Sequence, residues 1–289
     1  MKVILATDGS QYAQEAARLL AHLPHLERLE LTVLFVSNVP DLFGETPTKL
    51  IEQMKAEDAE KSAATFAHLR EIFDGANADL ELVVAHGQIG TTIVNEAQSR
   101  RSDLVVLGAI GHGMLDRLFG STSDFVATHA SCSVLVVRPT GLKNAKRPID
   151  VCFAYDTSSS SSAVFEQLSQ FGWGENSKIA VTNVVSIPFM YSEIPYELDI
   201  EEIKTATLRE LESAAIRLRK YSPHVKTHVL EANHVGDGLV QFTKESGSDI
   251  IVMGNTGKGL LNTFFLGSTS KYVLRHAACS VWIARKMPE

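Results

Sequence analysis

Cysteine is scarce in this sequence, and long apolar runs are absent. Only three of the 289 residues are cysteines, and no two of them form a CxxC pair, so neither a zinc knuckle nor a thioredoxin-type site is indicated. A low, odd cysteine count is typical of a reducing compartment. No apolar run approaches the roughly 18 residues of a membrane span, and the first run ends at Asp8, too early for a signal-peptide core. These absences predict a cytoplasmic protein without a membrane segment.

Positive charge is also in deficit. Lys and Arg number 27 against 34 Asp and Glu, which gives a formal net charge of −7. A nucleic-acid groove or a polybasic membrane anchor would need the opposite balance, so we expect neither partner. Apolar residues make up 45% of the chain, which is enough for ordinary packed cores. At about 150 residues per domain, the length predicts two domains.

The chain contains two copies of one pattern, about half a chain length apart. Segments 102–108, 120–123 and 129–134 reappear, with conservative changes, as 248–254, 267–270 and 276–281. A repeat this long indicates a duplicated domain, because solenoid repeats are far shorter. The predicted domains are 1–140 and 149–289, and the boundary falls in the polar stretch 139–148.

Each copy alternates short runs of Val, Ile and Leu with helical patterns. The runs lack polar alternation, which is typical of strands covered on both faces. The expected strands are 2–7, 30–37, 80–85, 103–108 and 133–138 in the first copy, and 149–154, 178–186, 226–231, 249–254 and 280–285 in the second. Strand–helix alternation predicts an α/β fold in which each copy forms a five-stranded parallel sheet with helices on both faces.

Two helices and two long connections stand out between these strands. The segment Asp8-Gly9-Ser10 is expected to cap a helix over about 10–23, and a second, longer helix is expected over 197–221. The connections 38–55 and 187–197 follow the second strand of each copy. They are equally consistent with flaps over the carboxyl ends of the strands, where open α/β sheets bind ligands, and with ordinary surface excursions.

A glycine-rich segment follows the fourth expected strand of the second copy. Gly254 ends the strand, Gly257 comes three positions later, and nine residues separate Gly257 from Gly267, which opens a Gly-Ser-Thr-Ser helix start. Glycine permits positive φ and close approach of the backbone to a ligand. Free amides at a helix start bind phosphate oxygens. We interpret the segment as a nucleotide phosphate site; the alternative is a tight strand–helix turn with packing glycines and a serine cap.

Side chains in and after this loop add to the phosphate interpretation. The hydroxyls of Ser268, Thr269 and Ser270 are further donors, and Lys258 can neutralise phosphate charge. Asn255 lies inside the loop and completes the candidate set.

The first copy carries a shorter version of the same loop. Only eight residues separate its second glycine from the helix start, and Asp116 adds negative charge. We therefore expect a weaker or lost phosphate site here, and one nucleotide per chain, in 149–285. The corresponding candidates are Gly108, Gly111, Gly120, Ser121 and Thr122.

This arrangement resembles the universal stress protein family, whose pattern Gly-x2-Gly-x9-Gly-Ser/Thr is matched in full by Gly254, Gly257, Gly267 and Ser268. The resemblance covers nearly the whole chain, as two tandem domains. It implies Rossmann-like domains with strand order 3-2-1-4-5, ATP as ligand with Mg²⁺ as an optional companion, and a regulatory role in the stress response. It also implies pairing of the two domains as an intrachain pseudo-dimer, with a homodimer as a further option.

The resemblance also implies roles at the nucleoside end. Asp8 and Asp156 would contact the adenine and ribose end of ATP, and the main chain at Val36 and Val185 would bind the adenine edge. The second copy departs from the family at Thr157, where Asp156 is followed by Thr and five serines instead of Gly-Ser.

No catalytic motif accompanies the loop. A P-loop, HExxH and GxSxG are all absent, and no loop carboxylate is an evident base, so we expect binding with slow or negligible hydrolysis. His129 and His276 each precede a cysteine in His-x2-Cys spacing, but further ligands are missing. We expect helix C-terminal histidines, buried cysteines and no metal site. An interaction module of the same fold that binds no nucleotide, and a weak ATPase, stay open as alternatives.

Overall fold

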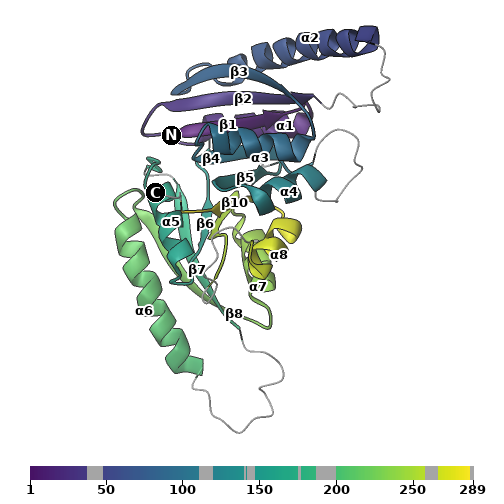
Figure 1. The fold of residues 1–289 in the computed structure, drawn as a ribbon. Helices are drawn as coiled ribbons and strands as arrows, with labels where there is room; N and C mark the ends of the chain where they lie inside the picture. Colours follow the sequence, from purple (N-terminus) through teal and green to yellow (C-terminus); the bar gives the residue numbers. More distant parts are fainter. Residues whose placement is uncertain are drawn as a thin grey trace. The chain divides into compact units, whose positions relative to one another are not determined.

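The computed structural model describes residues 1–37, 48–110, 120–139, 141, 147–174, 177–186, 200–257 and 266–286. It divides into two compact units, one holding Met1–Asn144 and the other Ala145–Pro288 (Figure 1). The division falls inside the polar stretch 139–148. The limits 1–140 and 149–289 stay predictions.

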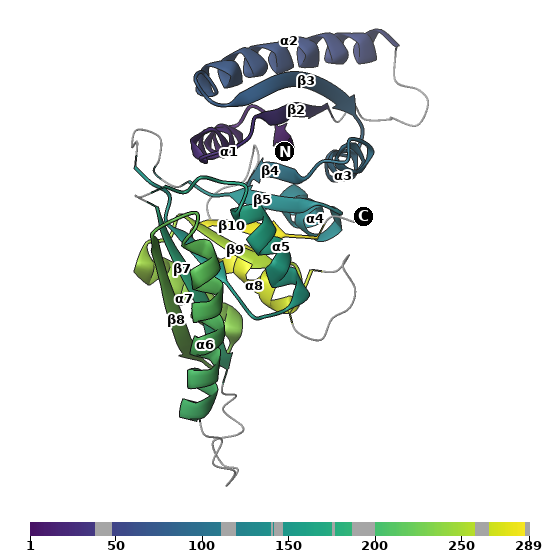
Figure 2. The ribbon, with the colours of Figure 1, turned by 90° about the vertical axis from the view of Figure 1, so that its left-hand side faces the viewer.

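The first unit is a parallel sheet with the spatial strand order β3-β2-β1-β4-β5. Its strands are β1 (Lys2–Thr7), β2 (Leu29–Ser37), β3 (Ala78–His86), β4 (Leu104–Gly108) and β5 (Ser133–Val137). Its helices are α1 (Gln11–His22), α2 (Thr48–Ile72), α3 (Ile89–Ser99) and α4 (Ser121–His129). Helices α1 and α2 lie on one face of the sheet and α3 and α4 on the other (Figure 2).

The second unit repeats this plan, with the strand order β8-β7-β6-β9-β10. Its strands are β6 (Val151–Ala154), β7 (Lys178–Ser186), β8 (His224–Ala232), β9 (Ile250–Gly254) and β10 (Ser280–Ala284). Its helices are α5 (Ser159–Leu168), α6 (Ile200–Leu218), α7 (Val235–Ser246) and α8 (Ser268–His276). The α/β fold and the order 3-2-1-4-5 are thus confirmed in both units.

Burial explains why the strands lack polar alternation. The central strands β4 and β9 are buried at every position except their last glycine, because helices cover both faces of the sheet. The outer strands β3 and β8 are largely half-buried or exposed. The apolar runs of the sequence therefore correspond to the central strands of each sheet. The candidate loops follow the carboxyl ends of these strands.

Serine caps start the first helix of each unit. Ser10 Oγ accepts a hydrogen bond from the Ala13 amide at 3.3 Å, and Ser158 Oγ accepts one from the Ser161 amide at 3.3 Å. The cap expected at Ser10 is confirmed. The connection expected over 38–55 is wrong from Thr48 onward, because α2 begins there. Residues 38–47 and 187–197 lie outside the described part.

Thr157 adopts a left-handed backbone conformation, with φ of 61°. The same turn in the first unit has Gly9, with φ of 77°. A β-branched residue is strained in this region, at a cost of roughly 1–2 kcal/mol. The second copy has Thr157 where the family pattern has glycine, and this substitution therefore lowers the stability of the second unit.

Replacing Thr157 with Gly should relieve this strain. We expect the second unit to gain about 0.5–1 kcal/mol in the free energy of unfolding, after the larger unfolded-state entropy of glycine is subtracted. Urea unfolding followed by tryptophan fluorescence measures it, because both tryptophans, Trp173 and Trp282, belong to this unit. Thr157→Ala, which keeps the strained φ, is the control and should gain less. Equal stability of all three proteins would show that no strain is stored at this turn.

Candidate functional site

A cavity of about 460 Å³ lies in the second unit at the carboxyl ends of β6, β7 and β9 and at the start of α8. This volume is within the range of small-molecule sites, roughly 300–1,000 Å³. The structure brings most of the candidate residues of the second copy together on its wall: Asp156, Gly254, Gly257, Gly267, Ser268, Thr269 and Ser270.

The start of α8 presents main-chain amides to this cavity. No described side chain caps the helix. The Gly267 amide donates to the Asn255 carbonyl at 2.7 Å, so the remaining first-turn amides are those of Ser268, Thr269 and Ser270. Such amides have no partner within the helix, and together with the helix dipole they favour an anion.

The Ser270 hydroxyl has a structural role. Ser270 is only 3% exposed, and its Oγ donates to the Gly254 carbonyl at 2.9 Å. Ser123 Oγ makes the same bond to the Gly108 carbonyl of the first unit at 2.8 Å. The expectation that the Ser270 hydroxyl donates to phosphate is therefore corrected: it fixes the helix start to the end of β9, and the hydroxyls of Ser268 and Thr269 remain as donors.

None of the three loop glycines has positive φ, and a Cβ at each of them would come close to a neighbouring residue. A Cβ at Gly254 would lie 2.4 Å from Ser160 Cβ. A Cβ at Gly257 would lie 3.1 Å from Asp156 Oδ2, and one at Gly267 would lie 3.3 Å from the Asn255 carbonyl oxygen. The positive φ that glycine permits is thus not used here. Close packing requires glycine at Gly254, whereas at Gly257 and Gly267 a Cβ would be tight and its neighbour would have to shift by a few tenths of an ångström.

The serine run after β6 orients the Asp156 carboxylate. Oδ1 accepts hydrogen bonds from the Ser161 hydroxyl at 2.7 Å and the Ser158 amide at 3.0 Å. Oδ2 lies on the side of Gly257. In the first unit, Asp8 Oδ1 accepts from the Ser10 amide at 2.9 Å. Both units thus hold an oriented carboxylate at the end of the first strand.

Two candidates of the second copy need correction. Val184, and not Val185, lines the cavity, because the pairing of Ala154 with Thr182 makes Val184 the counterpart of Val36. Asn255 lies beneath the loop, 4% exposed and outside the cavity wall, where its Oδ1 accepts a hydrogen bond from Ser160 Oγ at 3.2 Å. Lys258 lies outside the described residues.

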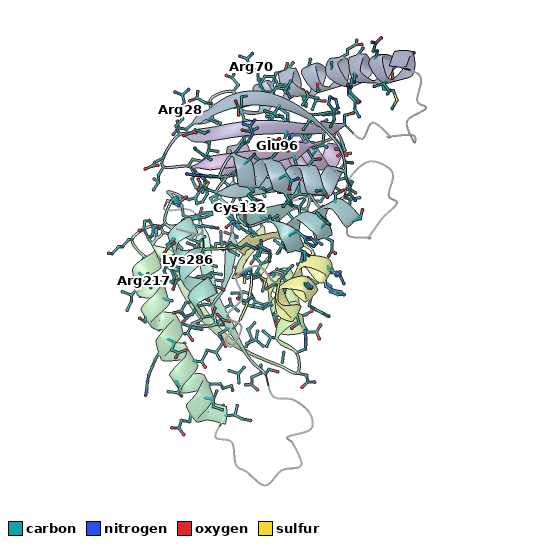
Figure 3. The ribbon with its side chains drawn as sticks, in the orientation of Figure 1. Arg28, Arg70, Glu96, Cys132, Arg217 and Lys286 are labelled. Atoms are coloured by element: carbon teal, nitrogen blue, oxygen red, sulfur yellow. The ribbon has the colours of Figure 1, made fainter. Side chains whose placement is uncertain are left out.

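Sequence reasoning missed Tyr155 and Asn183, which line the cavity beside Asp156. Asn183 Nδ2 donates to the Tyr155 carbonyl at 2.6 Å. Burial raises the pKa of the Tyr155 hydroxyl, so it stays neutral. Next to it, Arg217 of α6 (labelled in Figure 3) lies over the Phe165 ring, 4.1 Å from the ring centre. A polar residue inside the apolar run of β7 was the available signal for Asn183.

The first unit has an equivalent cavity of about 340 Å³. Its wall includes the candidates Asp8, Val36, Gly108, Gly120, Ser121 and Thr122, while Gly111 and Asp116 lie outside the described residues. Leu34 and Ile110 stand where the second unit has Thr182 and Thr256. The first cavity is thus smaller and more apolar than the second.

Known proteins share the sequence pattern over both units. The model of the universal stress protein family matches residues 1–138 and again residues 150–285. The chain belongs to the universal stress protein family. It is of the tandem type, since the two matches cover its two units.

Individual relatives agree with this assignment. Universal stress protein Mb2028c of Mycobacterium bovis is 25% identical over 301 residues, which cover 98% of this chain and 97% of that protein. Universal stress protein MJ0531 of Methanocaldococcus jannaschii is 28% identical over 141 residues, 47% of this chain and 81% of that protein. The crystal structure of a universal stress protein from Archaeoglobus fulgidus has the same fold, with a TM-score of 0.67 at 20% identity, covering 99% of this chain and 96% of that one.

The repeated histidines of this universal stress protein end helices, as expected. His129 Nδ1 lies 2.8 Å from the Phe125 carbonyl oxygen at the end of α4, and His276 Nδ1 lies 2.8 Å from the Tyr272 carbonyl oxygen at the end of α8. Among the residues that the structure describes, no group of three or more His, Cys, Asp or Glu side chains is arranged to hold a metal ion. Within the same ranges, no helix is long and apolar enough to cross a membrane.

The three cysteines of this universal stress protein are buried, so we expect them to be unreactive in the native state. Burial raises the pKa of Cys152 to about 12, so this thiol stays protonated and unreactive at pH 8. Cys132 (labelled in Figure 3) and Cys279 are 2% and 9% exposed. An alkylating reagent at pH 8 should leave all three thiols intact in buffer and modify all three in urea. Alkylation of the native protein at the rate of free cysteine would contradict this burial.

Proposed function

We propose that this universal stress protein binds ATP in the cavity of its second unit and acts as a regulatory protein of the stress response. The observation that carries the proposal is the uncapped start of α8, whose amides at Ser268, Thr269 and Ser270 open onto a cavity of about 460 Å³. A triphosphate supplies the negative charge that such a helix start favours.

The remaining walls suit the rest of the nucleotide. The oriented carboxylate of Asp156 is an acceptor for ribose hydroxyls, and the apolar side chains of Val184, Val235 and Leu239 offer a surface to the base. Lys258 and a Mg²⁺ ion would neutralise phosphate charge, Mg²⁺ keeping water ligands as it does in most nucleotide complexes. These assignments extend what the family resemblance implied for the nucleoside and phosphate ends.

Binding without rapid turnover is the expected behaviour. Asp156 is the one carboxylate among the described residues that line this cavity, and its Oδ1 is engaged by Ser161 and Ser158 at the end of β6. A hydrolase would need a base and a charge stabiliser at the γ-phosphate, next to α8. In a phosphate-release assay we expect slow or no turnover; robust turnover would favour the alternative of an ATPase.

The second unit is proposed as the main nucleotide site. The loop of the first copy is one residue shorter, and its cavity is smaller and more apolar. We expect about one ATP per chain by calorimetry of the intact protein. A stoichiometry of two would refute this ranking of the units.

The loop hypothesis has its own test. A valine at position 257 would place branched carbons against Asp156 Oδ2, where even a Cβ would lie at 3.1 Å, and would push the loop away from the carboxylate. Gly257→Val should therefore lower ATP affinity at least tenfold in calorimetry. Equal binding heats for Gly257→Val and the native chain would end the loop hypothesis, because ATP would then bind without the contacts of this loop, and the absence of any heat with the native chain would favour the alternative of an interaction module that binds no nucleotide.

Location and partners stay predictions. The cysteine content predicts the cytoplasm, and the negative net charge predicts no nucleic-acid partner. Pairing of the two units as a pseudo-dimer, and a homodimer of chains, are implied by the family resemblance.

A further inference from the structure

Helices α7 and α8 of the second unit lie side by side (Figure 1), and both line the candidate cavity. Val235 of α7 belongs to the apolar wall, and Ser268 of α8 belongs to the helix start that we propose as the phosphate site. Helix α8 is also fixed to β9, through the bond from the Ser270 hydroxyl to the Gly254 carbonyl. The contact between α7 and α8 therefore decides where the amides of the helix start lie relative to the apolar wall.

A tyrosine of α8 is bonded to an aspartate of α7. The Tyr272 hydroxyl donates to Oδ1 of Asp237, and this hydrogen bond raises the pKa of the phenol, which stays neutral. The Tyr272 ring lies against the first turn of α7, where a Cβ at Gly236 would come within 2.6 Å of the ring carbon Cδ1. A larger residue at position 236 would push the ring away, so glycine makes this close approach possible.

Two histidines complete the cluster around this bond. His276, one turn after Tyr272 on α8, stacks on the tyrosine ring with the ring centres 4.1 Å apart, and the His234 ring lies 4.8 Å from the same ring. His234 Nδ1 accepts a hydrogen bond from the Asp237 amide at 3.4 Å and lies 3.9 Å from Asp237 Oδ2. The Asp237 carboxylate therefore meets α8 through Oδ1 and the start of its own helix through Oδ2.

The first unit has the same ring packing without the hydrogen bond. Phe125 of α4 stands at the position of Tyr272, and a Cβ at Gly90 would lie 2.7 Å from its ring. Thr91 stands at the position of Asp237, and its hydroxyl donates to the side chain of the residue that precedes its own helix, at 2.9 Å. Packing of a ring on glycine is thus common to both units, whereas the phenol–carboxylate bond cannot form in the first, because phenylalanine has no hydroxyl.

We propose that Tyr272 and Asp237 are positioning residues that hold the start of α8 in the orientation that binds phosphate. The proposal rests on nucleotide binding in the second unit. Without this bond α8 keeps its link to β9 but loses its polar link to α7, and it populates further orientations. Only molecules whose α8 amides face the cavity correctly bind the triphosphate, so the apparent affinity falls by the fraction of such molecules. Asp156 and Val184 of the proposed nucleoside end stand at β6 and β7, so nucleoside binding does not depend on this orientation.

ATP and adenosine test this proposal, because only ATP carries phosphate. Tyr272→Phe copies the residue of the first unit and removes only the hydroxyl. In calorimetry of the intact chain it should lower ATP affinity about fivefold, the worth of one exposed hydrogen bond. The affinity for adenosine, measured as a competitor of ATP, should stay within about a factor of two. Urea midpoints by tryptophan fluorescence establish that the variant is folded.

Variants of Asp237 separate the hydrogen bond from charge and from general damage. Asp237→Asn and Asp237→Ala remove the same charge, but only asparagine keeps an acceptor oxygen for the phenol. The alanine variant should therefore bind ATP about fivefold more weakly than the asparagine variant. Adding Tyr272→Phe to Asp237→Ala should cause no further loss, since one bond serves both residues. The matched control in the first unit, Phe125→Tyr, should leave ATP affinity unchanged.

The outcomes distinguish this role from the proposed function. Full ATP affinity in Tyr272→Phe, additive losses in the double variant, or an equal loss of adenosine binding would overturn the positioning role and leave the proposed function intact. Failure of the native chain to bind ATP would overturn the proposed function itself.

Discussion

Replacing Gly254 with alanine should destabilise the second unit by about 3 kcal/mol. The added Cβ would lie 2.4 Å from Ser160 Cβ and 3.2 Å from the Ser160 main-chain carbon, far inside van der Waals contact. Both residues belong to regular elements, the end of β9 and the first turn of α5, so neither can move cheaply. Overpacking of this kind typically costs 1–3 kcal/mol and sometimes more.

The side chain that would clash with the methyl group added at position 254 belongs to Ser160, and a second substitution can remove its Cβ. In the double variant Gly254→Ala with Ser160→Gly, no Cβ stands opposite the new methyl group, and we expect part of the stability to return relative to the sum of the single changes. Urea unfolding followed by the fluorescence of Trp173 and Trp282 measures all four proteins. Strict additivity of the two substitutions would contradict the packing explanation.

Asp249 should be the next most sensitive position. Its side chain is 4% exposed and accepts two hydrogen bonds from Arg147, at 2.5 and 2.7 Å, and one from the Asp150 amide at 2.9 Å. Asp249→Ala leaves these donors without their acceptor. Removing one partner of a fully buried pair costs 3–5 kcal/mol, but Arg147 is 43% exposed and can return to water, so we expect about 2 kcal/mol.

The matched variant for Asp249 is Asn. Asp249→Asn keeps the shape and one acceptor oxygen and loses the charge, so we expect about half the loss of the alanine variant. The same unfolding assay measures both. Equal destabilisation by Ala and Asn would show that charge, and not the geometry of the three hydrogen bonds, stabilises this site.

Much of the fold could be predicted from the sequence because the signals are local. Ten short apolar runs and the repeat predicted ten strands and two sheets, and the order 3-2-1-4-5 followed from the family resemblance. The helix over 10–23 was predictable from Ser10 and the spacing of its apolar residues, and it is observed at Gln11–His22.

The site could be predicted only in part, because its details depend on contacts between distant residues. Val185 was predicted in place of Val184 because the dipeptide Val36-Ser37 of the first copy also occurs as Val185-Ser186 in the second. The true counterpart of Val36 is set by how the second strand of each unit pairs with the first strand. The reason for glycine at 254 is Ser160 of another element. Asn183 was visible as a polar residue, but its orientation depends on the Tyr155 carbonyl.

The most direct test of the central claim removes one amide from the start of α8. Proline is tolerated at the first helical position, where its missing N–H costs no helical bond, and Gly267, with φ of −62° and ψ of 158°, suits a following proline. Ser268→Pro should lower ATP affinity at least tenfold in calorimetry, whereas Ser268→Ala, which loses only the hydroxyl, should lower it about twofold. The same change in the first unit, Ser121→Pro, should have no effect. Full ATP affinity in Ser268→Pro would contradict the account, because main-chain donors at this helix start could not then be what holds the phosphates.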